Sequence, residues 1–248
     1  MASKVVEIVF VMDRSGSMAP CFEGLAAHLD SVVRPLQGFN FEVRMGFVGC
    51  QVLKDPDDGG GVYVMHTLGG HGFDPIYQQG GVGDALFTTD GAAFSGALRD
   101  LASGLQGDEN HLVALDCALD FPFSPLGTTR RVVALFSDER IEDGSVTPNN
   151  LLQVDALVNK IMARRILFFG ALPMSPALEQ LASADGCQVE SVAGGAGLAQ
   201  VDFGKLLGQM AKSISGTSLQ GLEGAYTKAL FGQDCWGTTD NYSAEGLR

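Results

Sequence analysis

An acidic side chain and two hydroxyls stand at alternate positions near the start of the chain. Asp13, Ser15 and Ser17 follow the apolar run 5–12, which is typical of a strand buried on both faces of a parallel sheet. Open α/β sheets bind ligands beyond the carboxyl ends of such strands, and Gly16 lets the backbone turn tightly there. One carboxylate with two hydroxyls is a poor nucleophile set but a good partial shell for a hard cation. The same residue types also form ordinary caps and turns.

The rest of the chain predicts alternating strands and helices. Apolar residues at steps of three and four predict a helix over 22–36, ended by Gly38, and the alternating pattern of 41–50 predicts the next strand. We predict further strands at 62–68, 131–136, 166–171 and 188–192, and further helices at 93–101, from 112 onward, and at 150–163, 176–184 and 203–214. The expected architecture is a doubly wound α/β fold, with a mostly parallel central sheet and helices on both faces.

A second carboxylate reaches the same edge of the predicted sheet. The strand 131–136 is as apolar as the first strand and delivers Ser137, Asp138 and Glu139 to its carboxyl end. Because ligands of open α/β sheets bind at that edge, Asp138 is expected on the same side of the sheet as Asp13.

The chain is long enough for one large α/β domain, which we expect over residues 1–217. Residues 54–84 interrupt it as a glycine-rich insertion, whose glycines complete neither a phosphate loop nor a dinucleotide fingerprint. His66 and His71 within this insertion are expected to be exposed loop histidines. The tail 218–248 loses the apolar pattern, and the sequence leaves open whether it docks on the domain or is disordered.

Composition and charge exclude some classes of function. The chain is 46% hydrophobic and 18% charged, which is typical of a globular protein. A formal net charge of −13 argues against a nucleic-acid surface, which needs clustered Lys and Arg, and against anionic membranes. The five cysteines are scattered and form no Cys-x-x-Cys pair, which indicates a reducing compartment. We recognise neither a signal peptide nor a membrane-spanning run, and therefore expect a cytoplasmic protein.

The motif Asp13-x-Ser15-x-Ser17 at the end of the first strand resembles the metal-ion-dependent adhesion site of von Willebrand factor A (VWA) domains. The order of the predicted elements from 5 to 214 is similar to that family as well. The resemblance implies that Asp138 is a further metal ligand, matching an Asp that follows a later strand. Family members usually carry Thr-Asp-Gly there, whereas this chain has Ser-Asp-Glu, so the turn must differ.

The fourth ligand position departs from the usual pattern. Many VWA domains place a threonine before a helix that carries Ala-Leu, and aligning that helix on Ala114 and Leu115 puts Glu109 at the threonine position. The loop 107–109 resembles one that offers a glutamate in the A-like domains of β integrins. Two alternatives stay open: Glu109 only favours the start of the helix, or Thr89 takes the ligand role. Oxygen ligands without His or Cys predict Mg²⁺, with Mn²⁺ or Ca²⁺ as alternatives.

The resemblance implies a non-enzymatic module that recognises a protein partner through the metal-bearing face. An acidic residue of the partner would complete the metal shell, more weakly if a glutamate in the fourth position adds a third carboxylate. A member of this kind without a leader sequence looks bacterial or intracellular. The residues expected to border the site and to shape the partner surface are Arg14, Met18, Phe22 and His111.

Two other functions remain open. A metal-dependent phosphoryl hydrolase of the haloacid dehalogenase type would use Asp13 as nucleophile. Such enzymes need a second carboxylate two residues later, where this chain has Ser15. A serine hydrolase would need a Gly-x-Ser-x-Gly elbow, which neither Ser15 nor Ser17 has. The remaining alternative is a scaffold protein whose metal site is degenerate.

Overall fold

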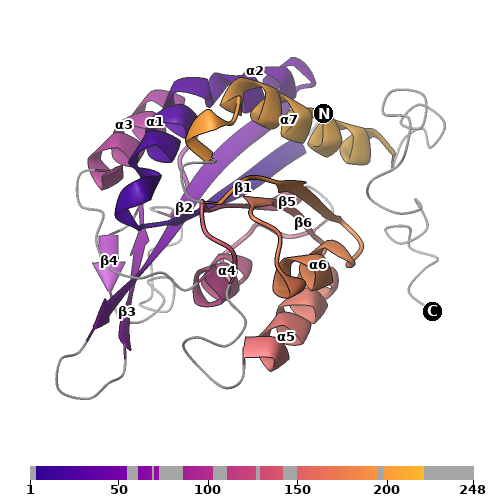
Figure 1. Cartoon of the computed structure of the whole chain (residues 1–248). Coiled ribbons are helices and arrows are strands. Elements are labelled where there is room, and N and C mark those ends of the chain that lie inside the picture. The colour runs from indigo at the N-terminus through magenta and orange to yellow at the C-terminus, as the bar shows by residue number, and fades with distance from the viewer. Residues whose placement is uncertain are drawn as a thin grey trace, which may run out of the picture.

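A seven-stranded β-sheet forms the centre of the molecule (Figure 1). The computed structural model describes residues 4–54, 61–68, 70–72, 86–102, 111–126, 129–141, 150–194 and 198–220. The strand order is β4-β3-β2-β1-β5-β6-β7, in which the pairs from β2 to β7 are parallel and the pairs that involve β3 are antiparallel. The bounds are β1 Lys4–Asp13, β2 Phe41–Lys54, β3 Gly61–Thr67, β4 Gly70–Gly72, β5 Thr129–Phe136, β6 Ile166–Leu172 and β7 Cys187–Ser191.

Helices cover both faces of this sheet (Figure 1). One face carries α1 (Ala19–His28), α2 (Asp30–Gly38), α3 (Gly91–Ala102) and α7 (Phe203–Gln220). The opposite face carries α4 (His111–Leu119), α5 (Asn150–Ala163) and α6 (Pro176–Ala182). The predicted doubly wound α/β fold with a mostly parallel sheet is therefore confirmed. Within the described ranges, no helix combines the length and apolar character that crossing a membrane requires.

Strand β1 is buried on both faces because its side chains alternate between two hydrophobic clusters. Ile8 and Phe10 pack in the cluster under α1, α2, α3 and α7, whereas Val9 and Val11 pack in the cluster under α4, α5 and α6. All four side chains are completely buried, and each burial of this kind contributes roughly 1.5–3 kcal/mol. This double burial explains the nearly continuous apolar run, in which Glu7 is the exception.

The predicted helix 22–36 is divided into α1 and α2 by a break at Leu29. Leu29 keeps helical dihedral angles (φ −53°, ψ −37°), and its carbonyl oxygen accepts hydrogen bonds from the N–H groups of Val32 and Val33. Pro35 lies inside α2, where its missing N–H removes one intrahelical hydrogen bond. The chain stays helical across the break, and one apolar stripe covers the sheet on both sides of it.

The two histidines that we expected in an exposed loop lie on strands instead. His66 is part of β3 and His71 is part of β4, and the antiparallel register places them opposite each other. The expectation was wrong because the segments on either side of residue 69, which itself lies outside the described residues, pair as antiparallel strands. The rest of the predicted insertion (55–60, 69 and 73–85) lies outside the described residues, as does the tail beyond Gln220.

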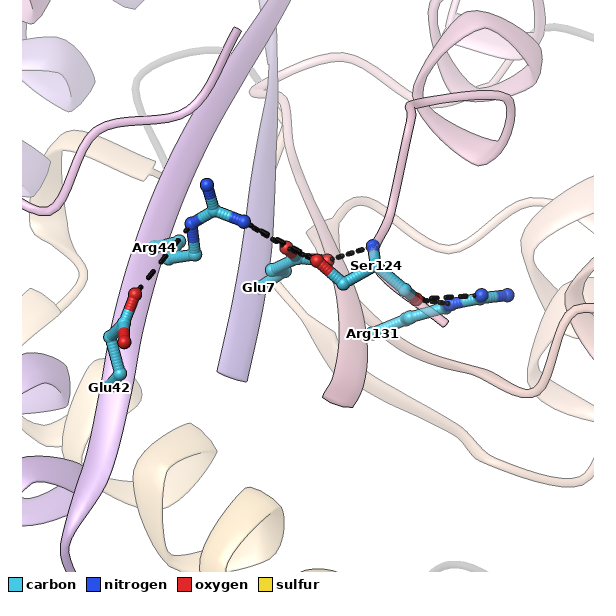
Figure 2. Close-up of polar contacts among 5 residues, drawn as sticks. All are labelled: Glu7, Glu42, Arg44, Ser124 and Arg131. Carbon is cyan, nitrogen blue, oxygen red and sulfur yellow. Dashed lines mark hydrogen bonds and ion pairs between the residues drawn. The ribbon is translucent and has the colours of Figure 1, made fainter. Parts of the chain in front are cut away.

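A fully buried carboxylate, Glu7, interrupts the apolar side of β1 (Figure 2). Its Oε1 accepts hydrogen bonds from Arg44 Nη1 at 2.8 Å and Ser124 Oγ at 2.6 Å, and its Oε2 accepts one from Ser124 N at 2.7 Å. Arg131 donates to the carbonyl oxygen of Ser124 through Nε at 3.2 Å and Nη2 at 2.8 Å. These contacts attach the segment after α4 to the amino-terminal part of β1, away from Asp13 at the other end of the strand.

We expect Glu7→Ala to lower the free energy of unfolding by about 1–3 kcal/mol, because it leaves two Ser124 donors and the partly buried Arg44 guanidinium without their carboxylate acceptor. Urea unfolding measures this loss. Glu42→Ala is the matched control: Glu42 contacts the same Arg44 at 3.9 Å, but its side chain is 49% exposed, and such pairs contribute about 0–1 kcal/mol. Equal losses in the two variants would contradict the anchoring role of Glu7.

Candidate metal site

The sheet brings Asp13 and Asp138 to one edge because β1 and β5 are parallel neighbours. The register pairs Met12 with Phe136, so both strands end at the same level. Asp13 is the last residue of β1, and Ser137 and Asp138 directly follow β5. The hydroxyl of Ser137 donates a hydrogen bond to Asp13 Oδ2 over 3.0 Å, which joins the two strand ends directly. The side chains of Asp13, Ser137 and Asp138 are all buried.

The loop after β1 places its two serine hydroxyls next to each other. The N–H of Ser15 donates to Asp13 Oδ1 over 2.5 Å, and the hydroxyls of Ser15 and Ser17 lie 3.0 Å apart. The 3-10 helix η1 (Gly16–Met18) closes the turn through a hydrogen bond from Met18 N to Ser15 O at 3.2 Å. Gly16 is not needed for this turn: its φ is not positive, and no atom lies within 4 Å of a Cβ built there.

Asp13 is a buried carboxylate whose charge is compensated by hydrogen-bond donors. Burial alone would raise its pKa, but contacts with His111, the Ser15 N–H and the Ser137 hydroxyl together bring the pKa below its usual value. His111 Nε2 lies 3.8 Å from Asp13 Oδ2. A carboxylate with a lowered pKa stabilises the fold above the pKa of the unfolded chain, and this stabilisation is lost as the pH falls through the folded-state value.

The donors around Ser137 include a histidine that we expected on the partner surface. His111 begins α4, is 6% exposed, and its Nε2 lies 2.7 Å from Ser137 Oγ. The N–H of Glu139 also donates to Ser137 Oγ, over 3.0 Å. His111 therefore belongs to the buried floor of the site, which corrects the prediction that it contacts a partner. No spacing in the sequence connects His111 with Ser137, since they are 26 residues apart and meet only through the fold.

Asp138 differs from Asp13 because its charge has no such compensation. Both of its carboxylate oxygens are buried, and neither has a hydrogen-bond partner of normal geometry in the described part of the chain. Burial raises its pKa, the Ser17 hydroxyl opposes this rise, and the neighbouring charge of Asp13 adds to it. A buried carboxylate without partners is costly. The neighbouring charges that raise its pKa, those of Asp13 and Glu139, are both negative.

The candidate metal-ligand atoms that the structure brings together, in the carboxylates and the serine hydroxyls, are all oxygen atoms. Cys21 also lies close to the two carboxylates, but burial, with the charges of Asp138 and Asp13, raises the pKa of its thiol to about 12, so it stays protonated. His111 Nε2 already contacts Ser137. In the parts of the chain that the structure describes, no group of three or more His, Cys, Asp or Glu side chains has a metal-binding arrangement. Any cation here would depend on the serine hydroxyls as well as on the carboxylates, which is a donor set for hard cations.

The fourth ligand position is not defined by the structure. Glu109 lies outside the described residues, so its predicted ligand role stays a prediction. Thr89, the alternative, is exposed in the short segment before α3. Its neighbour Thr88 pairs with Met45 on β2, with hydrogen bonds of 2.8 and 2.9 Å between their backbones. No described contact links Thr89 to Asp13, so the structure gives no support to Thr89 as the fourth ligand.

Three other residues that we expected at the partner surface are buried. Met18 and Phe22 have no solvent exposure and pack in the hydrophobic cluster under α1. Arg14 is 4% exposed, and its Cδ and Cγ lie within 3.0 Å of the position that a Cβ on Gly49 would occupy. A side chain without exposure cannot contact a partner, so the prediction is corrected for these residues. These three side chains instead pack in the interior next to the loop after β1, because the end of β1 is buried and the loop leads directly into the buried face of α1.

Comparison with solved structures shows a VWA-type fold. No protein-family model matches the sequence, and no curated protein matches it. The crystal structure of the SpRpn10 VWA domain is 14% identical with a TM-score of 0.51, and the match covers 85% of this chain and 95% of that one. The pilus adhesin SpaC from Lactobacillus rhamnosus GG has the same identity and TM-score, and the match covers 86% of this chain and 31% of the adhesin. This chain thus spans about a third of the adhesin's length, and the likeness is one of fold.

In metal-free protein, Asp138→Asn is expected to raise the free energy of unfolding by roughly 1–3 kcal/mol at neutral pH, because it removes a buried charge without partners. Since the pKa of Asp138 is raised in the folded state, wild-type stability should fall as the pH rises through that pKa. The difference between variant and wild type should widen over the same range. Urea unfolding in chelator at several pH values measures it.

Glu190→Gln is the control for this measurement, because Glu190 is exposed on β7 and its change should shift stability by less than about 0.5 kcal/mol. If Asp138→Asn were less stable than wild type in chelator at neutral pH, the description of Asp138 as an uncompensated carboxylate would be contradicted.

Proposed function

We propose that this chain is a non-enzymatic interaction module that binds a divalent cation at Asp13, Ser15, Ser17 and Asp138 and recognises a protein partner through it. The observation that carries the proposal is the buried carboxylate of Asp138, whose two oxygens lack partners beside the compensated carboxylate of Asp13. A divalent cation would supply the missing positive charge. Mg²⁺ suits hydroxyl and carboxylate ligands, and Mn²⁺ or Ca²⁺ are the alternatives.

The charges of the site favour a further acidic ligand from outside. Asp13 and Asp138 together only balance the charge of one divalent ion, so its remaining coordination positions face no excess negative charge and can take another carboxylate. Mg²⁺ usually keeps several waters and binds through one or two carboxylates, so a position remains for water or for an acidic residue of a partner. If Glu109 also binds, a third carboxylate would weaken that attraction. One of the two proteins of similar fold is described as a pilus adhesin, and this supports a binding role.

We favour a binding module over a hydrolase because the reactive groups are not accessible. Ser137 is the hydroxyl in contact with a histidine, and it has no solvent exposure. Asp13, the nucleophile in the phosphoryl-hydrolase alternative, is 3% exposed, and both of its oxygens already accept hydrogen bonds. A nucleophile must reach the reacting atom within about 3–3.5 Å. Turnover of a generic phosphate ester that Asp13→Asn abolishes would instead favour the hydrolase.

We further propose that the module works in a reducing compartment such as the cytoplasm. Cys21, Cys117 and Cys187 are buried and form no disulfide in the described part of the chain, as expected of small core residues rather than of disulfide partners.

Titration of Mg²⁺ or Mn²⁺ into chelator-stripped protein tests the cation site. Wild type should bind one ion per chain, and its unfolding free energy should rise by about 2.7 kcal/mol at a hundredfold excess over Kd. Asp138→Asn and Ser15→Ala/Ser17→Ala should lose most of this binding. Asp90→Asn is the control, because Asp90 caps α3 through Ala92 N and Ala93 N and has no role in the site. Absence of heat and of a thermal shift in wild type would leave only the scaffold alternative.

Affinity capture with the tagged chain tests partner recognition. Proteins that wild type captures in Mg²⁺ should be lost in chelator and lost with Ser15→Ala/Ser17→Ala, because both remove the cation from the face. Ser183→Ala removes an exposed hydroxyl that bonds only to Gln180 O at 2.7 Å, and should capture the same proteins as wild type. Capture that is unchanged in chelator would exclude recognition through the cation.

A further inference from the structure

Three buried side chains form a hydrogen-bonded chain that ends at Asp13. His111 Nε2, at the start of α4, lies 2.7 Å from Ser137 Oγ, and Ser137 Oγ donates to Asp13 Oδ2 over 3.0 Å. Ser137 has no solvent exposure, His111 is 6% exposed and Asp13 is 3% exposed. The chain therefore connects three elements, α4, β5 and β1, behind the proposed cation position. Neither Ser137 nor His111 is a ligand in the proposed function.

The hydroxyl of Ser137 has one orientation left in this arrangement. A serine hydroxyl has one proton to donate and two lone pairs to accept with. Its proton goes to Asp13 Oδ2, and one lone pair accepts the N–H of Glu139 at 3.0 Å. The contact with His111 Nε2 must then use the second lone pair, which requires a proton on Nε2. His111 thus completes the bonding of Ser137 and directs the hydroxyl proton toward Asp13.

The orientation of Asp13 is fixed from both sides as a result. Oδ1 accepts the N–H of Ser15, and Oδ2 accepts the hydroxyl of Ser137. A carboxylate held in this way cannot rotate without giving up one of these bonds, so an ion must approach it along a fixed direction. Ca²⁺ takes six to eight oxygens and often binds a carboxylate with both, whereas Mg²⁺ needs a near-ideal octahedron and accepts one oxygen from each carboxylate. The fixed orientation suits the smaller ion.

We propose that His111 and Ser137 are positioning residues that hold Asp13 in one orientation and thereby make the cation site prefer Mg²⁺ over Ca²⁺. This inference rests on the proposed function, since it concerns the same cation. The shorter contact of His111 is with Ser137 at 2.7 Å, against 3.8 Å to Asp13 Oδ2, so His111 acts mainly through Ser137, and Ser137 acts through Asp13. Neither residue needs to touch the ion or a partner, which agrees with their burial.

Calorimetric titration of MgCl₂ and of CaCl₂ into chelator-stripped protein tests the inference. Ser137→Ala and His111→Leu should each weaken Mg²⁺ binding by about 10–100-fold, as lost support of a metal ligand does, and weaken Ca²⁺ binding less, so that the ratio of the two affinities falls. His111→Gln, whose amide N–H replaces the Nε2 donor, should retain most of the Mg²⁺ affinity. Because the residues act in series, His111→Leu/Ser137→Ala should be no weaker than the weaker single variant.

Ser175→Ala is the matched control, because Ser175 is also a buried serine but caps α6 through Leu178 N; it should change neither affinity. Circular dichroism and thermal unfolding identify variants that do not fold, and if His111→Leu is one of them, Ser137→Ala and His111→Gln decide. Wild type that binds neither ion would refute the cation site itself. Wild type that binds Mg²⁺ with variants of equal affinity would refute only the positioning role. Equal losses for both ions without recovery in His111→Gln would overturn it too.

Discussion

Two carboxylates buried side by side at one edge of the sheet are the constraint on which the rest of the site depends. Asp13 is compensated by a backbone N–H and by a hydroxyl that a histidine supports, and its pKa is lowered. Asp138 has no comparable partners, and burial raises its pKa. Since an uncompensated buried charge is unfavourable, ionised Asp138 carries a cost that protonation or an external positive charge removes. We infer the cation from this asymmetry, and the partner from the cation.

The fold makes this asymmetry possible by holding the two strand ends rigidly. From Val6 to Asp13, β1 is buried between two helical layers, and β5 is its parallel neighbour, so Asp13 and Ser137 meet at hydrogen-bonding distance. At the other end of β1, Glu7 anchors the segment after α4 through Arg44 and Ser124. α4 itself begins with His111, which contacts Ser137. One strand thus carries a satisfied carboxylate at one end and the site at the other.

Much of the fold could be predicted from the sequence because apolar patterning determines which strands are buried on two faces. The parallel strands, the bounds of α5 and the Ser175 cap of α6 follow directly from runs, periodicity and capping residues. The pairing of β3 with β4 could not be predicted in this way, because glycine pairs are compatible with both long loops and strand connections. The break at Leu29 has no sequence signal, since the residue remains helical in its dihedral angles.

From the sequence, only those site residues could be proposed that directly follow a predicted strand. Asp13, Ser15 and Ser17 are neighbours in sequence, and Asp138 ends a strand of the same kind. The contact of His111 with Ser137 depends on where α4 packs, and the burial of Met18 and Phe22 depends on the angle at which α1 leaves the loop. Neither is determined by local sequence.

A crystal structure of the protein soaked in Mn²⁺, with anomalous scattering recorded at the manganese edge, is the most direct measurement of the central claim. The account predicts one strong anomalous peak beside the carboxylate of Asp138 and the hydroxyls of Ser15 and Ser17. An empty site at saturating Mn²⁺, with the Asp138 oxygens bonded instead to side chains or backbone of this chain, would contradict it.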